Sequence, residues 1–132
     1  MIIDTSVIIA ILKREDGFSD YSQKMMEAPN QNKMSAASFV EVAIVCDKNF
    51  KLAESNLLED IIESGSIDIV PFTAAQSRIA RAAYRQYGKG SGHPAQLNFG
   101  DCFAYALAKD SGEALLFKGS DFSQTDVVAA LP

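Results

Sequence analysis

The chain has 132 residues, of which 48% are hydrophobic, and this length and composition predict a single domain, residues 1–132, around one core. Seventeen acidic residues against twelve basic ones give a net charge of −5, which argues against a uniformly basic nucleic-acid binder. The charge is uneven, because residues 41–68 hold seven acids and two lysines whereas residues 73–109 hold five basic residues and one acid, so an anionic partner would face the second stretch.

Short apolar runs alternate with amphipathic segments along the whole chain. The apolar runs predict strands, which in chain order are Met1–Ile3, Lys33–Ser35, Ile67–Val70 and Ala114–Phe117. The amphipathic segments predict helices, which are Thr5–Leu12, Tyr21–Glu27, Ser38–Asp47, Lys51–Glu63, Thr73–Tyr87 and Phe99–Lys109, with a last short helix or turn after Asp121. Strands separated by helices predict an α/β protein in three layers, with helices on both faces of a short central parallel sheet.

The cysteines and the N-terminal segment indicate a compartment. Cys46 and Cys102 lie within apolar helical patterns and have no metal-ligand spacing, which predicts reduced core residues of a cytoplasmic protein. The apolar opening, residues 1–12, contains Asp4, lacks a basic leader and is shorter than the roughly 20 residues of a membrane helix. We therefore predict neither a signal peptide nor a membrane span.

Four acids stand where a predicted strand ends or a predicted helix begins, and they are Asp4, Glu41, Asp101 and Asp121. Ligands of parallel α/β folds bind outside the carboxyl ends of the strands, so we expect these acids to converge there. Crowded carboxylates repel one another, and such a cluster persists by protonation or by holding a cation. Ligand sets made only of oxygen favour Mg²⁺ or Mn²⁺, and we predict one or two such ions.

Each acid taken alone has a simpler explanation, which is capping of a helix. Glu41 with Ser38 fits a capping box, and Asp101 with Asn98 fits an acid in the first turn beside an N-cap. The other two acids could each cap the turn that follows them. Four negative charges at one sheet edge are not needed for capping, however, so their joint position favours a site.

Four segments carry a resemblance that spans nearly the whole chain. They are IIDTS at residues 2–6, SAASFVEV at 35–42, LNFGDC followed by AYALA at 97–108, and LFKGSDF at 116–122. In this order and at these separations they resemble PIN-domain ribonucleases, specifically VapC-type toxins of bacterial toxin–antitoxin pairs. The resemblance implies a metal-dependent endoribonuclease, usually a homodimer, that acts on RNA such as tRNA or rRNA and is held inactive by a cognate antitoxin protein. It places the family's acidic quartet on the four acids named above, whereas the loop at residues 88–96 matches no motif.

Hydrolysis of a phosphodiester fits these residue types. A divalent ion both lowers the pKa of bound water and neutralises charge, so no histidine base is required, and we interpret His93 as an exposed loop residue. Asp4 and Asp101 are the strongest candidate ligands, whereas Asp121 would hold a second ion or a bound water, and Glu41 would orient water or support the ligands. Hydroxyl groups beside the acids are candidates to hydrogen-bond them, with capping as the alternative, and they are Thr5, Ser6 and Ser120.

Basic residues recur at steps of three and four along the Thr73–Tyr87 helix and its end, and they are Arg78, Arg81, Arg85 and Lys89. They form either a solvated face or a track for RNA phosphates, with Tyr84 and Tyr87 nearby for stacking. Further positive charge could come from Lys13, Arg14 and Lys118, although Arg14 could equally pair with a neighbouring acid.

Two other functional classes remain to be weighed. A receiver-type signalling domain needs an acid pair after its first strand and a phospho-acceptor acid after a central one, but Thr5 and Ser6 follow Asp4, and no acid follows Ile67–Val70. A phosphatase of the Asp-x-Asp kind fails at Ser6 for the same reason. A PIN-like binding module that has lost its activity is the second class, and the intact acidic quartet argues against it.

Overall fold

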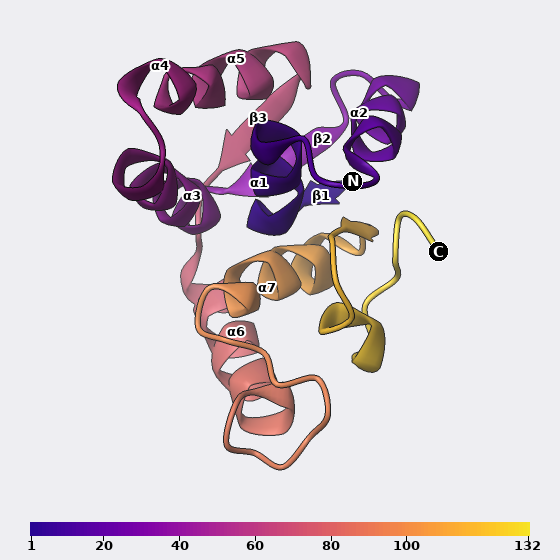
Figure 1. Cartoon of the computed structure of the whole chain (residues 1–132). Coiled ribbons are helices and arrows are strands. Elements are labelled where there is room, and N and C mark those ends of the chain that lie inside the picture. Colours follow the sequence, from indigo (N-terminus) through magenta and orange to yellow (C-terminus); the bar gives the residue numbers. More distant parts are fainter.

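A computed structural model describes residues 1–132 of the protein (Figure 1). Its strands are β1 (Ile2–Ile3), β2 (Asn32–Ser35), β3 (Ile67–Val70) and β4 (Leu115–Leu116). Its helices are α1 (Thr5–Lys13), α2 (Phe18–Glu27), α3 (Ala36–Asn49), α4 (Leu52–Ser55), α5 (Leu57–Ser64), α6 (Ala74–Tyr87), α7 (Asp101–Ser111) and the 3₁₀ turn η1 (Phe122–Gln124). None of these helices combines the length and the hydrophobicity of a membrane-spanning segment.

The strands form one parallel sheet in the order β3-β2-β1-β4. The first strand therefore lies inside the sheet, and Ile2 and Ile3 pair with Leu115 and Leu116 of the last strand. Because all four strands run in the same direction, their carboxyl ends meet at one edge of the sheet. The predicted parallel α/β architecture is confirmed.

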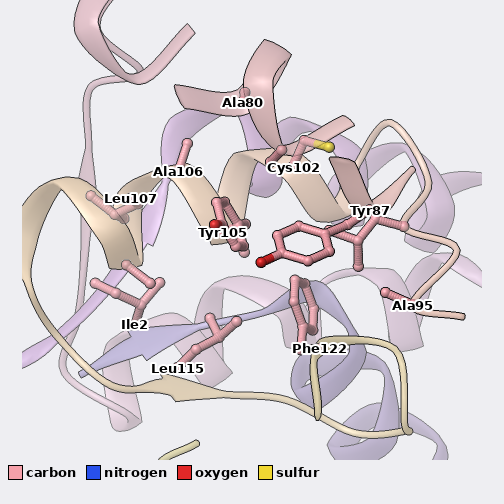
Figure 2. Close-up of a cluster of buried hydrophobic side chains, with 14 residues drawn as sticks. Ile2, Ala80, Tyr87, Ala95, Cys102, Tyr105, Ala106, Leu107, Leu115 and Phe122 are labelled. Carbon is pink, nitrogen blue, oxygen red and sulfur yellow. The ribbon is translucent and has the colours of Figure 1, made fainter. Parts of the chain in front are cut away.

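Side chains of β1 and of the neighbouring edge strand β4 alternate between two hydrophobic cores, as the two-residue period of a strand requires. Ile2 and Leu115 face the core beneath α6 and α7, whereas Ile3 and Leu116 face the core beneath α1, α2, α3 and α5. Figure 1 shows these two groups of helices on opposite sides of the sheet. Figure 2 shows the α6–α7 core, in which Tyr87 and Tyr105 lie with ring centroids 5.8 Å apart. The predicted three layers are present.

Several helix boundaries differ from the prediction. The segment Lys51–Glu63 was expected to form one helix but contains α4 and α5, separated at Asn56. Packing explains the difference, because α5 buries Leu58 and Ile62 whereas α4 buries no side chain. The N-cap of α3 is Ser35, whose Oγ accepts the backbone N–H of Ala37 at 3.3 Å, so the predicted Ser38–Glu41 capping box is wrong.

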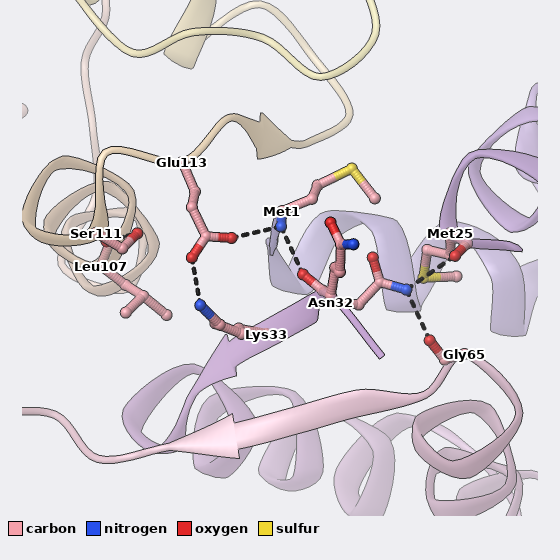
Figure 3. Close-up of polar contacts among 9 residues, drawn as sticks. Met1, Met25, Asn32, Lys33, Gly65, Leu107, Ser111 and Glu113 are labelled. Carbon is pink, nitrogen blue, oxygen red and sulfur yellow. Dashed lines mark hydrogen bonds and ion pairs between the residues drawn. The ribbon is translucent and has the colours of Figure 1, made fainter. Parts of the chain in front are cut away.

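Polar contacts join the chain segments at the amino ends of the strands (Figure 3). The carboxylate of Glu113 accepts a hydrogen bond from the N-terminal ammonium of Met1 at 2.6 Å and one from Lys33 Nζ at 2.5 Å. Burial alone would raise the pKa of Glu113, but these two donors bring it below its usual range. The buried amide of Asn32 donates to the carbonyls of Met25 and Gly65. The carboxylate at this edge therefore has two cationic partners.

Candidate functional site

Asp4 lies at the opposite, carboxyl edge of the sheet, directly after β1. Its side chain is only 3% exposed, and Oδ2 accepts the backbone N–H of Ser6 at 3.0 Å and the Ser6 hydroxyl at 2.6 Å. Burial raises the pKa of Asp4, the Ser6 hydrogen bonds oppose this, and the charge of Asp121 raises it further. Ser6 Oγ also accepts the backbone N–H of Lys118 at 2.9 Å, which links the end of β1 to the chain after β4.

Asp101 opens α7 and is half-buried. Its Oδ2 accepts the backbone N–H of Asn98 at 2.8 Å, while Asn98 Oδ1 accepts the backbone N–H of Asp101 at 2.9 Å. The reciprocal hydrogen bonds of a capping pair are therefore present, although the N-cap of α7 is Gly100 and not the predicted Asn98. Burial raises the pKa of Asp101 to about 6; the Asn98 hydrogen bond opposes the rise, and the charges of Asp4, Asp121 and Glu41 add to it. Capping and crowding thus coexist at this carboxyl group.

Glu41 reaches the site from α3 because Gly100 has no side chain. A Cβ on Gly100 would stand 1.6 Å from Glu41 Oε2 and 2.4 Å from its Cδ. Gly100 has φ −64° and ψ −37°, a conformation open to any residue, so the glycine is needed for space. Burial raises the pKa of Glu41, the Thr5 hydroxyl opposes this by a hydrogen bond, and the charge of Asp4 adds to the rise.

Asp121 lies just before η1 and is exposed. Its side chain makes no capping hydrogen bond, so the capping alternative raised for this residue is wrong. Its charge nevertheless raises the pKa of Asp4 and of Asp101. The neighbouring Ser120 is also exposed, and its carbonyl oxygen accepts a hydrogen bond from Ser123 Oγ.

The structure thus brings Asp4, Glu41, Asp101 and Asp121 together, and we call them the acid cluster. None of them forms an ion pair, since all five ion pairs of the protein lie elsewhere. No three side chains are arranged as a finished metal cage. The donor set is nevertheless carboxylate and hydroxyl oxygen in excess negative charge, which suits a hard divalent cation such as Mg²⁺ or Mn²⁺.

The predicted basic face is only partly helical. Arg78, Arg81 and Arg85 are exposed on α6 and form no ion pair. Lys89 was expected to continue this face, but α6 ends at Tyr87, and the backbone N–H of Lys89 donates to the carbonyl of Leu97 at 2.9 Å. Tyr87 is buried and unavailable for stacking, whereas the exposed Tyr84 remains available.

Other predicted positions have structural roles. Lys118 pairs with Glu15, whereas Arg14 ends α1 with a left-handed backbone, φ 51°, and forms no ion pair. His93 is half-buried, and not exposed as predicted, because its ring packs edge-on against Tyr87 at 4.8 Å. Both cysteines are free and buried, as predicted. Gly100 was the residue that the sequence analysis missed; its place directly before an acid in LNFGDC was the available signal.

Comparisons with known proteins agree with one another. A family model described as "PIN domain" matches residues 1–128. The chain is 49% identical to ribonuclease VapC28 of Mycobacterium tuberculosis, over 99% of this chain and 98% of that protein. It is 44% identical to ribonuclease VapC30 of the same species, over the full length of both.

Solved structures share the fold at low sequence identity. VapC20 of Mycobacterium tuberculosis, a toxin that cleaves the sarcin–ricin loop, superposes with a TM-score of 0.76 at 16% identity, over 96% of this chain and 95% of that one. A toxin–antitoxin complex from Klebsiella pneumoniae superposes with a TM-score of 0.70 at 18% identity, over 97% and 94% of the two chains.

Proposed function

Because the chain belongs to the PIN-domain family and, within it, to the VapC ribonucleases, we propose that it is a divalent-metal-dependent endoribonuclease and the toxin of a toxin–antitoxin pair. The observation that carries the proposal is the acid cluster at the carboxyl edge of the sheet, where four acids have no basic partner. At the opposite edge, by contrast, Glu113 forms ion pairs with Lys33 and the N-terminus.

Asp4, Asp101 and Asp121 would hold one or two Mg²⁺ or Mn²⁺ ions. Burial is the main cause of the raised pKa values of Asp4 and Asp101, and repulsion by the neighbouring carboxylates adds to it, so a cation would relieve unfavourable charge. When bound, such an ion supplies an acidified water and neutralises charge on the reacting phosphate. The three side chains would have to turn toward the ion, because they do not form a finished cage.

Glu41 would orient the attacking water and accept its proton. Its carboxylate is held against Gly100 and beside the Thr5 hydroxyl, so it has a defined position without being a cap. Ser6 fixes Asp4 by two hydrogen bonds and ties it to the chain after β4. We assign Thr5 and Ser6 to the support of the acids, and Ser120 as a further hydroxyl beside Asp121.

RNA is the proposed substrate, with tRNA and rRNA as candidate classes, and the α6 arginines are proposed to bind its phosphates. Arg78, Arg81 and Arg85 are exposed and form no ion pair, so their positive charge is available to an anionic partner. Lys89, in the loop after α6, would extend this binding surface.

A cognate antitoxin and a second copy of the chain are the proposed protein partners. An antitoxin could silence the site by placing a basic side chain among the acids, where it would replace the charge of the cation. Exposed apolar side chains of α3, Val40 and Ile44, offer surface for such contacts.

The proposal is tested by incubating the purified protein with total RNA and Mg²⁺ or Mn²⁺, with and without chelator, and mapping the cut ends. We expect cleavage that disappears with chelator and in an Asp101→Asn variant. Cleavage that persists in both would show contaminating ribonuclease. A well-folded wild-type protein that cuts no RNA with either metal would indicate instead a binding module without activity.

A further inference from the structure

We propose that a pocket between α6 and the start of α7 binds one unstacked nucleobase of the RNA beside the acid cluster. This inference rests on the proposed function and deepens it, because it names a subsite that would select the RNA sequence. We call this the aromatic pocket, and the residues that carry the argument are Phe72, Arg81, Tyr84, Arg85, Phe99 and Phe103.

The aromatic pocket has the size and walls of a site for a flat ring. Its volume is about 410 Å³, at the lower end of the roughly 300–1,000 Å³ typical of small-ligand sites. The ring of Phe103 stands edge-on to Phe72 at 5.0 Å and to Phe99 at 4.9 Å. These contacts hold the three rings in place, so a base could stack on them without the entropy cost of ordering these side chains on binding.

Two aromatic side chains of the pocket face solvent. Phe99 is 75% exposed and Tyr84 is 42% exposed, although the core beneath α6 and α7 lies close by. A phenylalanine left this exposed gains little for the fold, and exposed aromatic groups are what single-stranded RNA uses for stacking. The apolar part of the pocket therefore offers a surface to a partner.

Charge decides which partner fits. Arg81 and Arg85 line the same pocket, form no ion pair, and share it with no acidic side chain. An apolar protein segment would leave both guanidinium groups unmatched, whereas a nucleotide would place its base on the rings and its phosphate on an arginine. The pocket thus matches a nucleotide in both shape and charge.

The aromatic pocket is continuous with the acid cluster along the chain. Phe99 and Phe103 lie two residues before and two residues after Asp101, and Gly100 between them leaves the space that the Glu41 carboxylate occupies. In Figure 1, α6 lies against α7 and away from the sheet, so the RNA would pass from the α6 arginines toward the carboxyl edge. A base in the pocket would therefore belong to the RNA segment that leads toward the acid cluster.

The test measures RNA binding in chelator, so that it does not depend on cleavage. The probe is a fluorescein-labelled single-stranded RNA that contains the mapped cut sequence or, if nothing is cut, mixed sequence, followed by fluorescence anisotropy. Phe99→Ala should weaken binding by roughly five- to 150-fold, as expected for one lost base–aromatic stack, and Phe99→Trp should restore it. Leu52→Ala is the matched control, because Leu52 is 78% exposed but lies on α4, on the side of the sheet opposite α6 and α7 (Figure 1). The RNA affinity of this variant should stay at the wild-type value.

An RNA that lacks one base at a time identifies the bound nucleotide. Removal of one particular base should weaken wild-type binding as much as Phe99→Ala does, and the two changes combined should cost no more than either alone. Unchanged affinity in Phe99→Ala, or losses that add fully, would overturn the inference. So would a Phe99→Ala variant that binds RNA normally but no longer self-associates, because the pocket would then be a protein interface. Base-dependent binding without any cleavage would support the pocket and refute the proposed activity.

Discussion

Replacing Gly100 by alanine should separate the stability of this protein from its activity. The backbone of Gly100 is helical, so alanine adopts it without strain, and the loss of freedom in the unfolded chain should stabilise the fold by about 0.4–1 kcal/mol. The new Cβ would stand 1.6 Å from Glu41 Oε2, so the carboxylate must withdraw by roughly 2 Å to reach an ordinary contact distance. Glu41 is half-exposed at the end of a flexible side chain, so this withdrawal costs the fold little.

Activity should respond very differently. A displacement of about 1 Å at a catalytic group can cost roughly 100-fold in rate, and Gly100→Ala moves the Glu41 carboxylate further than that. We therefore expect a normal thermal unfolding curve, within a few degrees of wild type, and single-turnover RNA cleavage that is slower by about 100-fold or more.

The matched control is the same substitution in a Glu41→Ala background. With the carboxylate already gone, Gly100→Ala should change the cleavage rate by no more than about twofold. Gly100→Ala that cleaves RNA at the wild-type rate would refute the reasoning, as would a loss that is equally large in both backgrounds.

Four further predictions test the site and its partners. Asp4→Asn or Asp101→Asn should reduce RNA cleavage by roughly 100-fold or more, because a cation ligand loses its charge. Either substitution should also raise the melting temperature of the metal-free protein, because carboxylate repulsion falls. Undiminished cleavage by both purified variants is the contrary result. The pKa of Asp101 is about 6 in the folded chain and 3.8 ordinarily, so the folded wild-type protein binds more protons than the unfolded chain between these pH values and loses stability as the pH rises. The stability gain of metal-free Asp101→Asn over wild type should therefore grow from about pH 4 to about pH 6 and then level off. A stability difference that is independent of pH in urea titrations would contradict this. Substituting Arg78, Arg81 and Arg85 by glutamine should weaken RNA binding across sequences and lower the slope of log affinity against log salt by roughly 2. Cleavage at saturating RNA should change little. An unchanged slope in a folded variant would show that these arginines do not contact the RNA phosphates. Light scattering should give a particle of twice the chain mass, and a neighbouring antitoxin should lose its inhibition when its basic residues are neutralised; a monomer that no such protein inhibits would count against both partners.

The sequence predicted the layers and strands well because their signals are local. Ile67–Val70 is a short apolar run between turn signals, and its bounds match the structure. The split between α4 and α5 could not be predicted in the same way. The periodic hydrophobic pattern continues through Asn56. Leu58 and Ile62 of α5 pack against the core whereas α4 buries no side chain, and this difference in packing separates the two helices.

The convergence of the acids followed from their positions after strands and at helix starts, whereas the contacts between them did not. Ser35 rather than Ser38 caps α3 because the helix begins directly after β2, whereas the prediction left residues 36 and 37 outside both elements. Gly100 belongs to the same class of detail. Its importance depends on Glu41, which is 59 residues away in sequence and meets it only in the fold.

The strand order also sets when during synthesis the site can exist. β1 and Asp4 are made first, but β1 pairs with β4, and Ser6 is bonded to the chain just after that strand. At translation rates of about 5–20 residues per second, roughly 6 to 23 s separate Asp4 from Asp121. During this interval the nascent chain comes to carry Asp4, Glu41 and Asp101 without Asp121, so a ribosome that makes this protein would be exposed to a complete site only after Asp121 has been made.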